Sequence, residues 1–301
     1  MSNHTQEVAL GRRFEFGKNW RRFLAALNDQ RIAEAERSLR EMLAVDDLLD
    51  TSFLDAGSGS GMFSLAARRL GARVHSFDYD PQSVACTAEL KRRFFPDDPR
   101  WTVEEGSVLD RKYLESLGTF DVVYSWGVLH HTGSMWQALE NATIPVSPGG
   151  RLFISIYNQQ RYWTRLHTLL KRSYVSLPRP LGWLLAGPLI AFQVLKGLAR
   201  DVMLLRNPLS RYRDYSRSRG MSWWHDCLDW IGGYPFETAT PEAIFDFYLP
   251  RGFVLERLTT CGAGPGCNQF VFRKALDRWT WSKHPYVLTI APAPGQEGSR
   301  R

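Results

Sequence analysis

A short glycine-rich turn followed by an acidic residue constrains the fold of this chain more than any other feature. In LDAGSGSGMFSLAARRL (54–70), Gly57, Gly59 and Gly61 stand where an apolar run gives way to a helical pattern. A backbone that turns sharply there while passing close to a ligand has no room for side chains, which explains the glycines. Asp78 ends the next apolar run, 21 residues after Gly57, where a carboxylate can accept hydrogen bonds from both hydroxyls of a ribose. The pattern predicts a nucleotide cofactor.

Apolar runs alternate with helical stretches up to about residue 157, and this alternation predicts a parallel sheet with right-handed crossovers. We expect strands at 52–57, 73–78, 102–106, 120–126 and 150–157, with helices at 20–44, 61–70, 81–94, 111–117 and 134–146. Farther along, 240–253 begins as a helix with Thr240 as its cap and Pro241 as its first residue. Two more strands, 253–260 and 268–274, follow and are joined by a glycine-rich turn.

The glycine spacing bears on which nucleotide cofactor is bound. A dinucleotide favours G-x-G-x-x-G, because the third glycine lets the pyrophosphate sit against the helix. Here the spacing is G-x-G-x-G and Asp55 precedes the first glycine, which suits a zwitterionic amino acid joined to a nucleoside. The pattern favours S-adenosylmethionine, and a nicotinamide-dependent dehydrogenase is the competing interpretation.

With these motifs in view, the chain resembles the class I S-adenosylmethionine-dependent methyltransferases. LDAGSGSG, FDYDPQSV, EEGSVLD (104–110) and FDVVYSWGVLHHTGSMWQALEN (120–141) are similar to the first four motifs of that family, and SPGGRLFISIY to its following strand. The resemblance is strongest to the 3-demethylubiquinone O-methyltransferase-like group, through GKNW, LHHT and WHD…GGYPFE. It implies a Rossmann-like α/β fold, with a doubly wound, mostly parallel seven-stranded sheet, N-terminal helices and a helical insertion.

The resemblance also implies a set of cofactor contacts. Asp78 would hold the ribose, Tyr79 would lie against the adenine, and Ser107 and Val108 would meet the adenine edge, although the family often has Asp where this chain has Ser107. The other cofactor-binding residues that we predict are Asp55, Gly57, Ser58, Gly59, Gly61, Ser125 and Trp126. Lys18 and Trp20 in FEFGKNW (14–20) complete the set, because this segment can fold over the cofactor; the alternative is a helix lead-in with a buried Trp20.

Two pairs of residues are candidates for proton transfer. Methyl transfer from a sulfonium needs positioning and, for some acceptors, a base. His131 and His130 follow the fourth strand, where the acceptor binds in this fold, and a histidine there can accept a proton near neutral pH. His225 and Asp226 in WWHDCLDWIGGYPFE (223–237) are the second choice. The alternatives are packing or capping for the histidines and an aromatic satellite core for 223–237.

Positive charge is concentrated in one segment. The chain carries +7 overall, while residues 161–219 hold 12 basic and 2 acidic residues, a local charge of +10. Within that segment lies PLGWLLAGPLIAFQVL (180–195), sixteen residues without a charge, which we expect to be too short to span a bilayer. Contact of 180–206 with a membrane or lipid is one interpretation, and a lid or a contact between copies of the chain is the other. A nucleic-acid partner is disfavoured, because the block has apolar runs where phosphate binders have polar surface.

Four scattered cysteines, Cys86, Cys227, Cys261 and Cys267, match neither a disulfide scaffold nor the spacing of a structural zinc site, so we expect no metal. No secretory signal is visible at the start. The expectation is a cytoplasmic protein, with peripheral contact at the inner face of the membrane left open.

These observations predict a division of the chain into an N-terminal helical cover (1–50), a methyltransferase domain (51–157 and 238–274), a helical insertion that includes the acceptor region (158–237) and a C-terminal tail (275–301). The predicted activity is methyl transfer to a small apolar acceptor through oxygen or sulfur. S-methylation of a small thiol or sulfide is the alternative enzyme. A cofactor-binding interaction protein without turnover is the alternative from another class.

Overall fold

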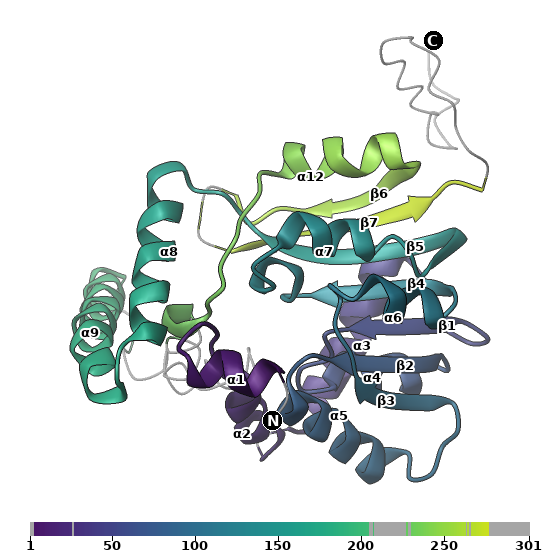
Figure 1. Ribbon diagram of the computed structural model, residues 1–301, viewed down its shortest axis with the longest axis horizontal. Coiled ribbons are helices and arrows are strands. Elements are labelled where there is room, and N and C mark those ends of the chain that lie inside the picture. Colours follow the sequence, from purple (N-terminus) through teal and green to yellow (C-terminus); the bar gives the residue numbers. More distant parts are fainter. Residues whose placement is uncertain are drawn as a thin grey trace, which may run out of the picture.

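A seven-stranded sheet organises the computed structural model, which describes residues 3–25, 27–204, 207, 227, 230–262, 264 and 266–276 (Figure 1). The strand order is β3-β2-β1-β4-β5-β7-β6. The strands are β1 (Ser52–Ala56), β2 (Arg73–Asp78), β3 (Trp101–Glu105), β4 (Phe120–Trp126), β5 (Val146–Tyr157), β6 (Phe253–Thr259) and β7 (Cys267–Lys274). Strands β1 to β5 are parallel, and β7 lies antiparallel between β5 and β6. The predicted mostly parallel, doubly wound sheet is confirmed.

Helices cover both faces of the sheet. Leu39, Leu65 and Leu90 bring helices α3 (Asp29–Leu43), α4 (Met62–Arg69) and α5 (Pro81–Phe94) into one buried core. On the other face, α6 (Arg111–Ser116), α7 (Met135–Asn141) and α12 (Pro241–Tyr248) share a second core. Helices α1 (Asn3–Ala9) and α2 (Gly17–Ala25) lie beyond the edge where β1, β2 and β4 end (Figure 1).

Local capping explains several helix boundaries. Asp80 caps α5 by accepting a hydrogen bond from the backbone N of Gln82, and Thr240 caps α12 in the same way from Ala243. The continuous helix predicted at 20–44 is wrong. Asn28 has an extended backbone and caps α3 through the backbone N of Arg31, which separates α2 from α3.

The helix predicted at 134–146 is shorter than expected and ends at Asn141. Strand β5 begins at Val146 instead of residue 150, because Val146 pairs with Phe120 across a register shift in β4. Strands β2 and β4 and helix α5 have the predicted bounds. The domain division remains a prediction.

After β5 the chain forms a pair of helices at the side of the molecule, α8 (Arg161–Ser176) and α9 (Arg179–Met203) (Figure 1). The expectation that this apolar stretch is too short to span a bilayer is wrong on length. Residues Leu181–Met203 form 23 continuous helical residues, long and apolar enough to cross a membrane by length and composition only. The sixteen-residue estimate failed because it stopped at the first charge, whereas the helix continues past Lys196 and Arg200.

Candidate functional site

The glycine turn connects β1 to α4 and has the close backbone approach that its composition predicts. Gly57, Gly59 and Gly61 have φ angles of +92°, +55° and +80°, in the left-handed region that favours glycine. A Cβ atom at Gly57 would lie 2.5 Å from the side chain of Val128, and one at Gly61 would lie 2.8 Å from the Cα of Thr87. The turn therefore tolerates no side chain at these two positions without displacement of its neighbours.

Asp78 lies at the carboxyl end of β2, directly against this turn. Its carboxylate accepts hydrogen bonds from the backbone N of Gly59 at 2.8 Å and of Asp80 at 2.9 Å. Burial raises its pKa to about 6, against the opposing effect of these hydrogen bonds. An acceptor-only group beside a glycine turn fits the ribose hydroxyls of S-adenosylmethionine, because they are donors and the carboxylate has further lone pairs.

Asp55 lies near the end of β1, beneath the glycine turn, and is only 2% exposed to solvent. Its carboxylate accepts a hydrogen bond from Ser64 Oγ in α4 at 2.5 Å, and Ser64 in turn accepts one from Ser76. Burial raises the pKa of Asp55 to about 7, and the nearby Asp78 adds to that effect. This carboxylate joins α4 to the first two strands beneath the turn.

The predicted adenine-side residues lie beyond β2 and β3. The Tyr79 hydroxyl donates to Glu7 at 3.3 Å, and its ring meets that of His4 edge-on, so α1 covers Tyr79. Ser107 accepts a hydrogen bond from the backbone N of Leu109 and so stabilises the turn after β3. Val108 is buried in the core.

Residues 13–20, which we call the strap, cross over the glycine turn. The Trp20 indole lies 3.2 Å from where a Cβ of Gly59 would be, so it covers the turn. Lys18 instead points to Glu15, 2.5 Å away, and is 46% exposed at its side chain. The structure therefore brings Trp20 to the turn but pairs Lys18 outside it.

Arg13 ties the strap to the loop after β4, a contact that the sequence analysis missed. Its guanidinium donates to the carbonyl of His131 at 2.8 Å and to that of Thr132 at 3.3 Å. At the other end, the backbone N of Gly17 donates to Asp80. One segment thus connects the cofactor turn to the histidine loop, and no local sequence pattern encodes such a long-range contact.

His131 lies in η1 (Leu129–His131) after β4 and is half-buried. Its Nδ1 is 2.6 Å from the carbonyl of Pro235, so Nδ1 carries the hydrogen and Nε2 keeps its lone pair. Burial lowers the pKa of His131 to about 3, and the charges of Lys171 and Arg13 add to this. The ring is neutral at physiological pH and presents a hydrogen-bond acceptor.

His130 is fully buried and differs from its neighbour. In the part of the chain that the structure describes, neither ring nitrogen has a hydrogen-bond partner within normal geometry. Burial lowers its pKa well below the usual range, although the backbone of Ser155 opposes this. The ring packs on those of His131 and Tyr157, 4.5 and 4.6 Å away between centroids. A positioning role fits His130 better than proton transfer.

Aromatic rings surround His131. Its ring centroid lies 5.1 Å from that of Phe16, 5.8 Å from that of Tyr157 and 6.3 Å from that of Phe236. We call these three residues the aromatic wall. They come from the strap, the end of β5 and the end of the predicted insertion, and they surround His131 with apolar rings.

The remaining predicted residues fall in different places. Ser125 is buried and donates to the carbonyl of Ala56, which ties the ends of β4 and β1 together. Trp126 is 43% exposed at the carboxyl end of β4. His225 and Asp226 lie outside the described residues.

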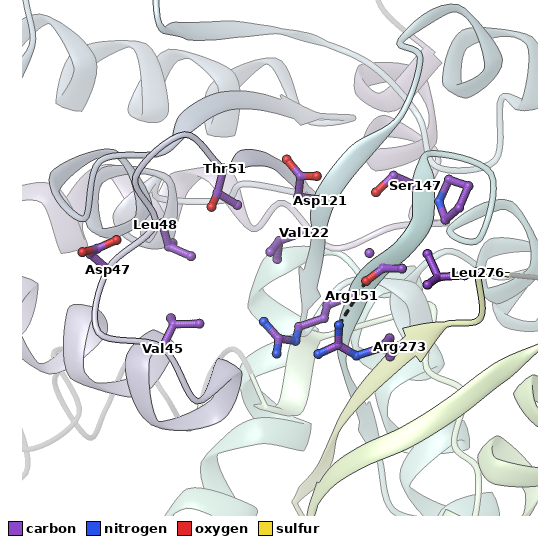
Figure 2. A pocket seen from close by; sticks show the side chains of 13 residues that line it. Val45, Asp47, Leu48, Thr51, Asp121, Val122, Ser147, Arg151, Arg273 and Leu276 are labelled. Carbon is purple, nitrogen blue, oxygen red and sulfur yellow. Dashed lines mark hydrogen bonds between the residues drawn. The ribbon is translucent and has the colours of Figure 1, made fainter.

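A hollow of about 390 Å³ lies at the opposite edge of the sheet, where β1, β4 and β5 begin (Figure 2). Its charged groups are paired within the protein. Arg151 and Arg273 both contact Glu256, and Asp121 accepts a hydrogen bond from the backbone N of Ser52 at 2.8 Å. The hollow is far along the strands from the glycine turn and His131, so it is not part of this site.

The comparisons with known proteins agree with this geometry. The chain matches a family model described as a methyltransferase domain over residues 18–229, and it belongs to that family. Its fold is that of magnesium protoporphyrin IX methyltransferase from Synechocystis PCC 6803, a structure with bound SAH. The two chains are 14% identical with a TM-score of 0.50, over 86% of this chain and 94% of the other. The class is therefore the S-adenosylmethionine-dependent methyltransferases with a Rossmann-like fold.

Among curated proteins, the chain is similar to the ubiquinone biosynthesis O-methyltransferase of Colwellia psychrerythraea, with 32% identity over 36% of this chain and 43% of that protein. It is also 48% identical to the ribosomal protein L11 methyltransferase of Methylococcus capsulatus, over 38% of this chain and 36% of the relative. The chain spans less than half the length of each of these two relatives.

Proposed function

We propose that this protein transfers a methyl group from S-adenosylmethionine to an oxygen or sulfur atom of a small apolar acceptor. The observation that carries the proposal is the position of a neutral His131, whose Nε2 keeps its lone pair, beside an aromatic wall and the glycine turn. When bound, the cofactor supplies a methyl group on a positively charged sulfur, which leaves as a neutral thioether when the acceptor's lone pair takes the methyl carbon.

Each residue of the site has its own role in the proposed reaction. Asp78 accepts the hydrogen bonds of the ribose, and the turn at Gly57, Gly59 and Gly61 lets the backbone approach the cofactor. Trp20 covers the turn and keeps water from the reacting groups. His131 accepts the acceptor's proton at Nε2, while Pro235 holds its ring in place through Nδ1. The remaining predicted contacts, from Asp55, Ser58, Tyr79, Ser107, Val108, Ser125 and Trp126, belong to the same proposal.

Oxygen is favoured as the methylated atom, because curated relatives are named O-methyltransferases. S-methylation of a small thiol or sulfide is the alternative. A cofactor-binding protein without turnover is less well supported, because binding alone gives no reason for a histidine that is held in one tautomer beside the turn.

The test is formation of S-adenosylhomocysteine by the purified protein with quinols, catechols, small thiols and sulfide. Turnover with a quinol or catechol supports the proposal, and turnover with sulfide alone favours the alternative. His131→Ala is expected to lower turnover about a hundredfold, since general-base groups contribute on that scale, while calorimetry shows unchanged affinity for S-adenosylhomocysteine. His75→Ala on β2 is the control. A normal turnover rate in His131→Ala would show that His131 is not the base.

A second part of the proposal concerns location. We infer that helices α8 and α9 contact the inner face of a membrane and that the protein is otherwise cytoplasmic. A stripe on α9 at helical spacing faces outward: Leu181, Leu184, Phe192, Leu195 and Val202 are 47, 73, 62, 64 and 64% exposed. Exposed basic residues accompany it, namely Arg161, Arg165, Arg172, Lys196 and Arg200. An apolar stripe with basic flanks suits anionic lipid.

Contact at the surface is favoured over a span of the bilayer. Ala186 and Ile190, on the opposite side of α9, are buried and pack with Ile231. A helix with one face held by the protein cannot be surrounded by lipid.

A further inference from the structure

Glu237 is the last residue of the predicted insertion (158–237), and the proposed function does not yet use it. Its Oε2 accepts a hydrogen bond from the backbone N of Met135 at 2.9 Å. Its own backbone N donates to the carbonyl of His130, also at 2.9 Å. These two partners lie on either side of His131 in the sequence. The carboxylate and the backbone of one distant residue therefore hold the loop that carries the proposed base.

The carboxylate of Glu237 takes the place of a local helix cap. Met135 is the first residue of α7, and its N–H has no acceptor inside the helix. Within the described residues, the side chain of Ser134 at the cap position makes no capping hydrogen bond. Burial raises the pKa of Glu237, and hydrogen bonds from the backbone of Met135 and of Gly133 oppose this. The carboxylate is therefore anchored at the start of α7.

Residues 235–237, which we call the clamp, pass this anchoring on to the imidazole ring. The carbonyl of Pro235 lies 2.6 Å from Nδ1 of His131, and the ring of Phe236 packs against that of His131, 6.3 Å away between centroids. A Cβ atom at Gly133 would lie 3.3 Å from Cγ of Pro235, so the loop passes close to the clamp. The anchored carboxylate is two residues from the carbonyl that binds the ring, so a shift of one displaces the other.

The clamp controls a property that the other contact to this loop does not set. Arg13 donates to the carbonyls of His131 and Thr132, and so places the backbone of the loop. Pro235 instead binds the ring, and the hydrogen bond made by one ring nitrogen decides which nitrogen carries the proton. A ring released from Pro235 exchanges between its two tautomers. The tautomer with the hydrogen on Nε2 cannot accept a proton there.

We propose that Glu237 is the positioning residue that keeps the hydrogen of His131 on Nδ1, by holding the clamp against the start of α7. Glu237 acts on the reaction through the clamp and not through contact with the acceptor. The inference rests on the proposed function for the role of His131 as the base, and it deepens that function by naming the residue on which the base depends.

The test reads the tautomer directly, by nitrogen NMR of the full-length, ligand-free protein labelled with nitrogen-15 at its histidines. The pKa of His131 is about 3, so its ring is neutral near neutral pH and the two nitrogen shifts report which atom carries the hydrogen. The signals that disappear in His131→Ala assign this ring. We expect a hydrogen on Nδ1 in the wild type and averaged shifts of both nitrogens in Glu237→Ala. Glu237→Gln, which keeps an oxygen for Met135, is expected to resemble the wild type.

Turnover is the second measurement. Glu237→Ala is expected to lower kcat about tenfold, because the base is misplaced, while KM and the affinity for S-adenosylhomocysteine stay unchanged. Glu237→Gln is expected to stay within about threefold of the wild type, because a neutral acceptor still forms the hydrogen bond. Glu242→Ala, at an exposed glutamate of α12, is the charge-matched control and is expected to leave the tautomer and the rate unchanged.

A merely structural role for Glu237 would give a different pattern. Wild-type shifts of His131 in Glu237→Ala would overturn the inference even if the melting temperature falls, and so would a wild type with its hydrogen on Nε2. If Glu237→Ala does not fold, Glu237→Asp replaces it with the same expectation, since its carboxylate reaches one methylene less far. Turnover by the wild type with no change of tautomer in the variants defeats this inference alone. A changed tautomer in a protein without turnover supports the clamp and counts against the proposed function.

Discussion

At the carboxyl ends of β1 and β2, buried carboxylates are paired inside the protein, whereas along α9 large apolar side chains face outward. Asp78 and Asp55 are buried and hydrogen-bonded to Gly59 and Ser64. On α9, Leu184 is 73% exposed. The first region is held together by contacts within the chain, and the second presents an apolar surface that we propose contacts a membrane.

Substitutions in the two regions are therefore expected to have different effects on folding and on binding. In the turn region a change acts on folding and on cofactor binding together, because the same atoms serve both. On the outer side of α9 a change leaves folding alone and alters only what the helix touches. Each of the following predictions separates these two behaviours.

The largest effect is expected from Asp78→Ala. Loss of two charge-assisted hydrogen bonds to a ribose lowers cofactor affinity about a hundredfold. Calorimetry with S-adenosylhomocysteine measures it, and Asp121→Ala at the opposite edge of the sheet is the control. Because the pKa of Asp78 is about 6, the wild-type affinity is also expected to weaken as the pH falls below that value. Equal affinity in the variant would refute the ribose contact.

Two glycine substitutions compare the regions directly. Gly61→Ala is expected to destabilise the protein by about 2 kcal/mol, because the left-handed backbone and the Thr87 contact both resist a methyl group. Gly187→Ala in α9 meets no atom within 4 Å beyond its chain neighbours, and its gain in helix propensity is offset by the clash of a Cβ with the ring of Pro188, so little change in stability is expected. Denaturant unfolding measures both. Similar effects of the same sign would contradict the comparison.

The double variant Leu184→Glu and Phe192→Glu tests the outward stripe. It is expected to weaken binding to anionic phosphatidylglycerol vesicles about tenfold or more in flotation, since two apolar groups are lost and two negative charges are added. The melting temperature should not change. Val254→Glu, at a 55% exposed position of β6, is the control.

Two further measurements, of salt dependence and of self-association, refine the test of the outward stripe on α9. Vesicle binding of the wild type is expected to fall with ionic strength, because part of the attraction is electrostatic. No binding to vesicles, together with a dimer that the double variant dissociates, would assign the stripe to a second copy of the chain instead.

The smallest effect concerns Asp55. Its raised pKa of about 7 means that the folded state holds a proton that the unfolded state releases above its ordinary value near 3.8. This carboxyl therefore makes the ligand-free protein less stable as the pH rises from about 4 to 7. Asp55→Asn keeps an acceptor for Ser64 and removes that dependence. Its melting temperature is expected to gain about 2 °C relative to the wild type between pH 5 and pH 8. A constant difference would show that Asp55 is charged at both values.

The features that the sequence predicted correctly are those that a short stretch of residues encodes. The strands and glycine turn were found because each carries its own pattern, an apolar run followed by residues that only a tight turn requires. The same reasoning gave a single helix at 20–44, because the periodicity of apolar residues continued across Asn28 while its capping role outweighed it. It also misjudged α9, where a few charges do not end a helix.

Short-range patterning and backbone sterics are enough to predict the sheet, the glycine turn and the acidic residue at the end of β2 from the residues alone. Tertiary packing alone places Arg13 at the histidine loop and brings Lys171 and His131 to the same ring, that of Phe236. These contacts join segments that are distant in the chain. Their energies come from packing and burial, which no periodicity of residues encodes.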